Sequence, residues 1–357
     1  MAEKRNEEKG NEKTPRRVGQ REVAKEAGVS LMTVSLAMRN SPSISVATRE
    51  KVREAAERVG YRPDPEVARL MGKLRSSRVA SRSVVIALID LQTSDLQHSY
   101  NLRLKEGVEK HLDRLGYGCA CFKLRDYRDD VSKIVRVIRE RGIIGCILLP
   151  SDRPITFSSK VNWDGISVVA ATTSVLSPRF HRVGPNQVFN SMRVVEEMQL
   201  RGYTNIGAIF SESLERRQRH RYSIALAWYG HRDRILLLPD DIDDAQEAKM
   251  IRDWVATHRV DVLFVQNASM VMRALQARKF GSGAKQVGLV SLGTVEDSKV
   301  SSLDELPEFV GESAVSLLVG MMFNSETGVP ATPRSTVVDG IFREGKTVRA
   351  LRPTGEK

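Results

Sequence analysis

Seven short runs of mainly aliphatic residues follow one another along the second part of the chain, and amphipathic helical segments separate them. Most runs are continuously apolar instead of alternating with polar residues, which is typical of parallel strands that helices cover on both faces. This order of strand and helix predicts a doubly wound α/β architecture. Residues 83–357 are many for one sheet, so we expect two similar lobes. The runs are residues 83–90, 117–124, 145–150, 166–172, 205–210, 261–266 and 287–293.

The first part of the chain has a different pattern, which is helical from residue 20 to residue 61. Residues 23–40, VAKEAGVSLMTVSLAMRN, predict two short helices joined at Gly28, a turn position where a positive φ costs little without a Cβ. Ser30 is then placed to cap the second helix through its side-chain oxygen. We expect the two helices to pack through Val23, Ala24, Ala27, Val29, Val34 and Ala37.

A third helix, residues 45–60, begins at a serine cap and can close a small core with the first two. Its inward face is expected to hold Val46, Val52, Ala55, Ala56 and Val59. Two amphipathic helices can produce a helix-turn-helix pattern by chance, so the third helix strengthens the interpretation. Downstream, Asp64, Pro65 and Glu66 form a start signal for a further short helix that would be stable only when docked.

The charge of the chain is concentrated in its first quarter. The whole chain has a formal net charge of +12, and residues 1–82 hold 19 Lys and Arg against 11 Asp and Glu. A basic module joined to a more balanced domain is typical of nucleic-acid-binding proteins. Residues 1–17 contain no apolar segment of a secretory signal and are expected to be a disordered charged arm.

The remaining composition favours a cytoplasmic protein. No apolar run approaches the roughly 20 residues that a membrane-spanning helix needs. The three cysteines lie in apolar runs, which predicts inert buried thiols in a reducing compartment. They are Cys119, Cys121 and Cys146.

The ordered set of motifs in the first part resembles the headpiece and hinge of the Lac repressor (LacI/GalR) family of bacterial transcription regulators. The matching elements are VAKEAGVS, TVS, PSIS, TREKV, GYRP and a short hinge containing Leu70. Later segments are similar to the periplasmic-binding-protein-like core of that family, among them RGYTNIGAIF and STVVDGIFREGKTV. The match is strong at the front of the chain and looser behind.

The resemblance implies an all-α helix-turn-helix headpiece and hinge helix joined to a two-lobed α/β core. The headpiece would span residues 18–62, the hinge helix and linker residues 63–82, and the core residues 83–357. The N-lobe is expected at residues 83–203 and 294–323, and the C-lobe at residues 204–293 and 324–357. The family works as homodimers, with tetramers as the alternative, on a pseudo-palindromic double-stranded DNA operator. A nucleoid-associated repressor controlled by a small-molecule effector in the cleft between the lobes follows from the resemblance.

The same resemblance assigns DNA-binding roles to residues on the second helix and in the hinge. Leu31 and Met32 match the two main specificity positions of the family, and Leu70 matches its leucine that wedges a central base step. This chain departs from the family at Leu36 and Arg39, where arginine and asparagine are common. Base readout would therefore rely on apolar contacts such as thymine methyl groups. The alternative is that Leu31 or Leu36 packs against the headpiece or an oligomer partner. The full DNA-binding set is Ser30, Leu31, Met32, Thr33, Ser35, Leu36, Arg39, Asn40, Arg69 and Leu70.

The effector site is less defined, and the resemblance suggests Asn186, Arg219 and Gln266 at strand ends, where open α/β sheets bind ligands. Sugar-binding members of the family place an acidic residue after the strand that corresponds to GLVSL. This chain has Leu292, Gly293 and Thr294 there, followed by Glu296 and Asp297, and it has Asn186 at a second acidic position. Both departures weaken a sugar assignment. The basic run with Arg216, Arg217, Arg219 and Arg221 could bind an anionic effector, and a solvated helix face is the alternative.

Other functional classes find little support in the sequence. The chain has no GxSxG motif and no phosphate-binding P-loop, and its six histidines are scattered without metal-ligand spacing. We therefore expect no enzymatic activity, cofactor or metal. Two alternatives remain, a regulator whose core only dimerises and a secreted solute-binding protein.

Overall fold

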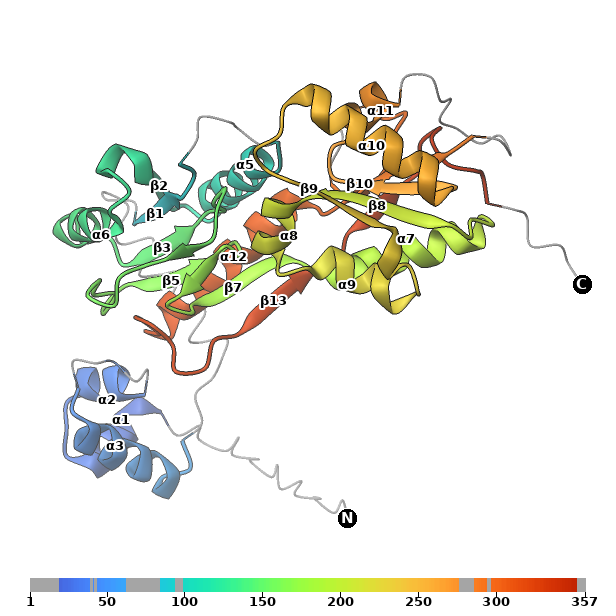
Figure 1. Ribbon diagram of the computed structural model, residues 1–357. Coiled ribbons are helices and arrows are strands. Elements are labelled where there is room, and N and C mark those ends of the chain that lie inside the picture. The colour runs from blue at the N-terminus through green and yellow to red at the C-terminus, as the bar shows by residue number, and fades with distance from the viewer. Residues whose placement is uncertain are drawn as a thin grey trace, which may run out of the picture. The chain divides into compact units, whose positions relative to one another are not determined.

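The computed structural model describes residues 19–38, 41, 44–61, 84–93, 99–275, 286–293 and 297–351 (Figure 1). The chain divides into two compact units. One comprises Met1–Arg82 with the short segment Phe323–Glu326, and the other comprises the rest of the chain.

The small unit contains three helices, α1 (Gln20–Ala27), α2 (Leu31–Ala37) and α3 (Val46–Arg58). Gly28 ends α1 with a φ of 62°, as its place in the turn predicts. The Ser30 Oγ accepts a hydrogen bond of 3.0 Å from the Thr33 backbone N–H at the start of α2, and Ser45 caps α3 in the same way. The predicted helix-turn-helix geometry and both caps are therefore present.

In the described part of the small unit, seven buried side chains from all three helices form the core. They are Val23, Ala27, Val34, Ala37, Val52, Ala55 and Ala56. Ala24, Val29 and Val59 pack against them at partly buried positions. The prediction for Val46 was wrong, because this side chain, in the first turn of α3, is 62% exposed. At about 100° per residue it points away from the face that Val52, Ala55 and Ala56 bury.

The first sheet of the large unit has six parallel strands in the order β13-β7-β5-β3-β1-β2. Its core clusters on the two faces include side chains of α6 (Val131–Glu140) on one side and of α5 (Ser99–Arg114) and α12 (Pro307–Phe323) on the other. Coverage on both faces explains why its central strands are fully buried. The strands are β1 (Val85–Asp90), β2 (Gly118–Lys123), β3 (Gly145–Leu148), β5 (Ser167–Ala170), β7 (His181–Pro185) and β13 (Ser335–Val338).

The second sheet has the order β14-β12-β11-β10-β8-β9, and only β14 is antiparallel to its neighbour. Its strands are β8 (Ile206–Ser211), β9 (Ile235–Leu238), β10 (Val262–Val265), β11 (Gly288–Ser291), β12 (Ser301–Asp304) and β14 (Ile341–Arg343). Its helices are α7 (Gln187–Leu200), α8 (Glu212–Gln218), α9 (Arg221–Trp228), α10 (Asp244–His258) and α11 (Ala268–Ala274). Short pieces complete the unit, namely β4 (Ile155–Thr156), β6 (Val175–Ser177), η1 (Leu124–Tyr127) and η2 (Arg232–Arg234). The two-lobed α/β prediction is confirmed.

The expected bounds of the lobes need correction. The strand β12 belongs to the second sheet although it was expected in the N-lobe, and β13 belongs to the first sheet although it was expected in the C-lobe. The helix α7 packs its Val194, Val195 and Met198 into the core of the second lobe. The chain therefore crosses between the sheets after β7, after β12 and between β13 and β14.

The prediction of three buried thiols was wrong for two of them. The strand β2 lies at the edge of its sheet, so Cys119 and Cys121 are exposed and only Cys146 is buried. Partial burial still raises the pKa of Cys119 to about 11, which keeps its thiol protonated at neutral pH. Among the described residues no helix is long and apolar enough to cross a membrane.

Candidate nucleic-acid interface and effector cleft

The helix α2 presents two large apolar side chains away from the core. Met32 is 72% exposed and Leu31 is 45% exposed, whereas Val34 and Ala37 on the same helix are buried. Leu36 is half-buried, so its exposure is intermediate between that of Leu31 and Met32 and that of Val34 and Ala37. Leu31 and Met32 therefore do not serve the headpiece core, and the packing alternative within the small unit applies at most to Leu36.

The polar residues of α2 partly satisfy one another. The Ser30 Oγ lies 2.8 Å from the Thr33 Oγ1 while it also accepts the Thr33 backbone N–H. These two exposed or half-exposed hydroxyls keep spare hydrogen-bonding capacity, which suits phosphate oxygens. Ser35 lies at a half-buried position on the same helix. The positions predicted at Arg39, Asn40, Arg69 and Leu70, together with the arm and the hinge helix, lie outside the described residues.

The three predicted effector residues lie at strand or helix ends of the large unit. Asn186 precedes α7, and its Nδ2 donates a 2.8 Å hydrogen bond to Asp339 Oδ1. Gln266 follows β10, and its Oε1 accepts a 3.2 Å hydrogen bond from Ser211 Oγ at the end of β8. Arg219 ends α8 and lines a pocket that includes neither of the other two residues. Arg219 therefore does not share this pocket with Asn186 or Gln266.

The end of the GLVSL strand carries no carboxylate among the residues that the structure describes there. Leu292 is buried and Gly293 is half-exposed, while Thr294 and Glu296 lie outside the described residues. The carboxylate of Asp297 accepts a 2.9 Å hydrogen bond from the Lys299 backbone N–H in an exposed turn.

The basic run on and after α8 is not a single solvated face. Arg216 is paired with Glu212 at 3.1 Å and also with Asp240. Arg217 reaches the other lobe, where its Nη1 donates a 3.1 Å hydrogen bond to the backbone oxygen of Asp152, and burial lowers the pKa of this guanidinium. Of the four arginines in this run, Arg219 lines a pocket beside β7, whereas the Arg221 Nη1 donates a 3.1 Å hydrogen bond to Gln187 Oε1.

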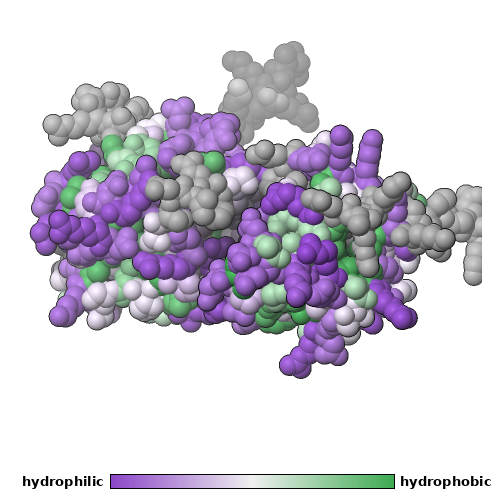
Figure 2. All heavy atoms as spheres, turned by 45° about the horizontal axis from the view of Figure 1, so that its top comes forward, coloured by the Kyte–Doolittle hydropathy of each residue, from purple (hydrophilic) through white to green (hydrophobic). Residues whose placement is uncertain are grey.

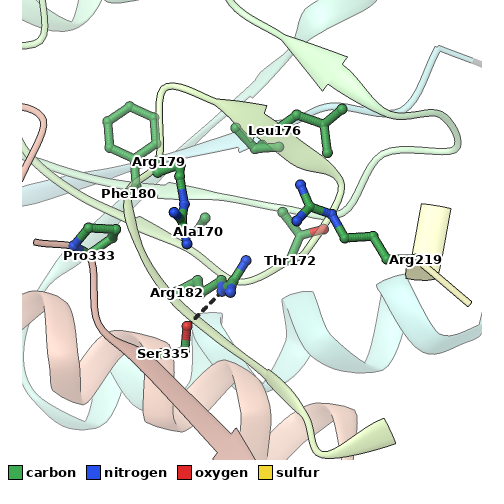
Figure 3. Close-up of a pocket in the computed structure, with 10 residues that line it drawn as sticks. Ala170, Thr172, Leu176, Arg179, Phe180, Arg182, Arg219, Pro333 and Ser335 are labelled. Atoms are coloured by element: carbon green, nitrogen blue, oxygen red, sulfur yellow. Dashed lines mark hydrogen bonds between the residues drawn. The ribbon is translucent and has the colours of Figure 1, made fainter. Parts of the chain in front are cut away.

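The pocket lies at the carboxyl end of β5 and beside β7 and β13 (Figure 3). Figure 3 shows the guanidinium groups of Arg179, Arg182 and Arg219 around one space. Arg182 donates a 2.7 Å hydrogen bond to Ser335 Oγ. Burial, followed by the charges of Arg221, Arg179 and Arg219, lowers the pKa of Arg182. Sequence reasoning missed Arg179 and Arg182, and the density of basic residues in PRFHR was the signal that could have found them.

A buried carboxyl lies where the chain crosses between the lobes. Glu305 follows β12, and its Oε1 accepts a 3.0 Å hydrogen bond from the Tyr222 hydroxyl on α9. Burial raises the pKa of Glu305 to about 7, and the neighbouring charge of Asp304 adds to this rise while the Tyr222 hydrogen bond opposes it. Glu305 is therefore a group whose charge changes near neutral pH.

We expect Glu305→Gln to remove part of the pH dependence of core stability. Because the folded-state pKa of about 7 exceeds the unfolded value, the folded protein holds a proton between about pH 4.5 and 7 that the unfolded chain releases. Stability from this group is present at low pH and is lost as pH rises through that window. Relative to wild type, the variant should gain about 3 kcal/mol of stability between pH 4.5 and pH 8, measured by thermal unfolding. The exposed Glu140→Gln variant should follow wild type, and parallel wild-type and E305Q curves would contradict the assignment.

The face of the molecule in Figure 2 is mostly hydrophilic, with apolar patches among the polar side chains. Several bulky apolar side chains are exposed on the helices of the large unit. They include Leu102 on α5, Phe309 on α12, Leu200 on α7 and Ile224 and Trp228 on α9. Trp228 has 77% of its surface exposed.

Comparison with known proteins supports the same interpretation. The family model described as "Bacterial regulatory proteins, lacI family" matches residues 21–64. The transcriptional regulator DegA of Bacillus subtilis is 31% identical over 127 residues, which are 35% of this chain and 34% of DegA. The maltose regulon regulatory protein MalI of Vibrio furnissii is 29% identical over 124 residues, which are 35% of this chain and 82% of MalI. Both are named as regulatory proteins and not as enzymes. This chain thus matches about a third of the length of DegA.

The fold has known counterparts over nearly its whole length. The Lac repressor dimer bound to operator and the anti-inducer ONPF superposes with a TM-score of 0.55, covering 94% of this chain and 100% of that chain. The sequences are only 15% identical, so this likeness concerns the fold. It confirms the predicted combination of a helix-turn-helix headpiece with a periplasmic-binding-protein-like core.

Proposed function

Because residues 21–64 match the model of the lacI family of bacterial regulatory proteins, we propose that this chain is a sequence-specific DNA-binding transcriptional regulator. The observation that carries the proposal is the exposed pair Leu31 and Met32 at the start of α2, on a helix whose other apolar residues are buried or half-buried. A helix-turn-helix protein reads bases with residues at the N-terminal end of its second helix. Two exposed apolar side chains at this position are unfavourable in water. They become favourable when they contact thymine methyl groups in the major groove.

We further propose that two copies bind a pseudo-palindromic operator as a homodimer and that the protein represses transcription. The exposed apolar side chains on α5, α9 and α12 support an interface between copies, and they include Trp228. The similar Lac repressor structure is a dimer bound to operator, which supports the same arrangement. A two-fold protein requires half-sites whose spacing mirrors its own symmetry.

The large unit is proposed to bind a small effector between its lobes and thereby to change operator affinity. Hydrogen bonds join the two lobes, such as the 3.1 Å bond that Thr173 Oγ1 donates to Gln218 Oε1. Such bonds can form or break when the lobes move, which supports a cleft whose width a ligand could alter. A ligand that binds one lobe arrangement better than another shifts the equilibrium between them. The alternative is a regulator whose large unit only dimerises. We place either form of the protein in the cytoplasm, at the nucleoid.

The DNA-reading role is tested with the double variant Leu31→Ala and Met32→Ala in a binding-site selection from random duplex DNA. We expect the preferred site to change, with discrimination at one or more A·T positions reduced about tenfold, because the apolar contacts to the base edges are removed. Val46→Ala is the matched control, since it trims an exposed apolar side chain of the same unit that lies on α3. An unchanged site preference in the double variant would overturn the assignment of these residues.

A further inference from the structure

We propose that the pocket around Arg179, Arg182 and Arg219, with Arg221 beside it, binds the anionic end of the effector, a phosphate or carboxylate group. This inference rests on the proposed function as a ligand-controlled regulator. The inference adds the chemical class of the ligand. The sequence leaves this class open, because Leu292, Gly293 and Thr294 follow β11 where sugar-binding family members have an acidic residue.

The arginines come from both lobes of the large unit. Arg179 and Arg182 lie before and on β7 in the first lobe, whereas Arg219 and Arg221 lie between and on α8 and α9 in the second. Figure 3 shows the guanidinium groups of Arg179, Arg182 and Arg219 turned toward one space beside Thr172. An anion in this space would contact both lobes at once. Its binding would therefore favour the lobe arrangement that brings the four charges together.

The four arginines have no carboxylate partner within the described part of the chain. Neighbouring basic groups are paired, such as Arg216 with Glu212 and Arg153 with Asp129. In this cluster, Arg182 instead donates to the Ser335 hydroxyl and Arg221 to the Gln187 side-chain oxygen at 3.1 Å. Like charges that approach one another in a partly buried place repel, and an anion would relieve this repulsion. The lowered pKa of Arg182, caused by burial and then by its three basic neighbours, is the electrostatic sign of that repulsion.

The backbone holds Arg219 in an uncommon conformation. Arg219 and His220 have successive positive φ angles of 54° and 57°, a left-handed conformation that non-glycine residues seldom adopt. Each such residue costs on the order of 1 kcal/mol or more, and such strain clusters at ligand-binding sites. This turn ends α8 at Gln218 and directs the Arg219 side chain to the pocket while Arg221 begins α9.

The pocket wall distinguishes an anion from a neutral sugar. None of its ten lining residues is Asp or Glu, so no carboxylate there can accept hydrogen bonds from ring hydroxyls. Arginine presents a planar fork of donors that matches phosphate and carboxylate oxygens. The enclosed volume of about 20 Å³ holds little more than one water-sized group. Only the charged end of a ligand would enter, and the rest would extend into the cleft.

The test uses the full chain and measures binding of inorganic phosphate by isothermal titration calorimetry, with malonate as the carboxylate probe and glucose as the neutral one. We expect saturable binding of phosphate or malonate and none of glucose, in a buffer whose ionic strength is held constant with NaCl. The double variant Arg182→Gln and Arg219→Gln should weaken the binding about 10- to 100-fold, the effect of losing charge-assisted hydrogen bonds. Arg219→Gln alone, at an exposed position, provides a second variant in case the double variant does not fold.

The control variant is Arg216→Gln, which removes the same charge from α8 at a site already paired with Glu212 and Asp240. It should bind the probe as wild type does. The tighter of the two probes identifies the group, phosphate or carboxylate. Absence of saturable binding of both anions by wild type, or equal binding by wild type and both cluster variants, would overturn the inference. Operator binding measured on the same samples distinguishes failure of this inference from failure of the proposed function. A chain that binds operator but no anion contradicts only the anion-binding inference.

Discussion

Full-length protein carrying Val34→Asp is expected to lose more than 100-fold in operator affinity while its large unit stays folded. Val34 has no exposed surface and lies in a core to which the described residues of the small unit contribute seven buried side chains. An unpaired carboxylate in such a place costs several kcal/mol, a large part of the stability of so small a unit. A 100-fold loss corresponds to about 2.7 kcal/mol, so unfolding of the headpiece is more than sufficient. Fluorescence anisotropy with a labelled operator measures the affinity.

The control for this prediction is Val46→Asp. It introduces the same charge into the same unit at a position that is 62% exposed, so the fold of the unit should persist. We expect its operator affinity to fall only a few-fold, because an exposed charge is screened by salt. Circular dichroism of both variants should show an intact large unit. Wild-type affinity in the Val34→Asp variant would contradict the assignment of DNA binding to this unit.

The second large effect concerns the contact between α5 and α12. A Cβ added at Gly311 would lie 2.4 Å from the Leu104 backbone oxygen and 2.9 Å from the Val108 backbone nitrogen, distances that real structures do not show. Neither atom is the end of a flexible side chain, so a helix must move. We expect Gly311→Ala to destabilise the large unit by about 3 kcal/mol or more. The unfolding midpoint in urea, followed by circular dichroism, measures this change.

The matched control lies on the same helix. Gly320 is exposed, and no atom lies within 4 Å of the Cβ that alanine would add. Replacement of an exposed helical glycine by alanine stabilises a protein by roughly 0.5–1 kcal/mol. The two substitutions therefore have the same chemistry and opposite expected signs. Equal midpoints for both variants would show that the close approach of α5 and α12 is not present in solution.

The small unit could be predicted from the sequence because its determinants are local. Gly28 and the capping serines Ser30 and Ser45 act within a few residues of their own positions. Val46 was misplaced because it was grouped with the apolar residues of α3 without regard to its angle around the helix. At about 100° per residue it lies roughly 130° from the centre of the face that Val52, Ala55 and Ala56 bury, and its side chain is exposed.

The large unit contains features that local sequence patterns do not predict. Continuous apolar runs predicted the parallel strands. For the short strands β12 and β13, however, the sheet to which each belongs depends on where the chain crosses between the lobes. Likewise, Arg179 and Arg219 are 40 positions apart in sequence and come from different lobes, so no spacing rule relates them. The basic run on α8 was visible, but its division into paired and unpaired arginines requires the positions of Glu212 and Asp240.

The central claim is that this protein binds a two-fold DNA site through its headpiece, and the salt dependence of binding tests it most directly. The full chain would be titrated against the site recovered by selection, at several salt concentrations and with the stoichiometry determined in the same experiment. We predict two chains per site and a linear fall of the logarithm of affinity with the logarithm of salt concentration, because phosphate contacts release counterions. Affinity that does not change with salt, or recovery of no preferred site, would contradict the account.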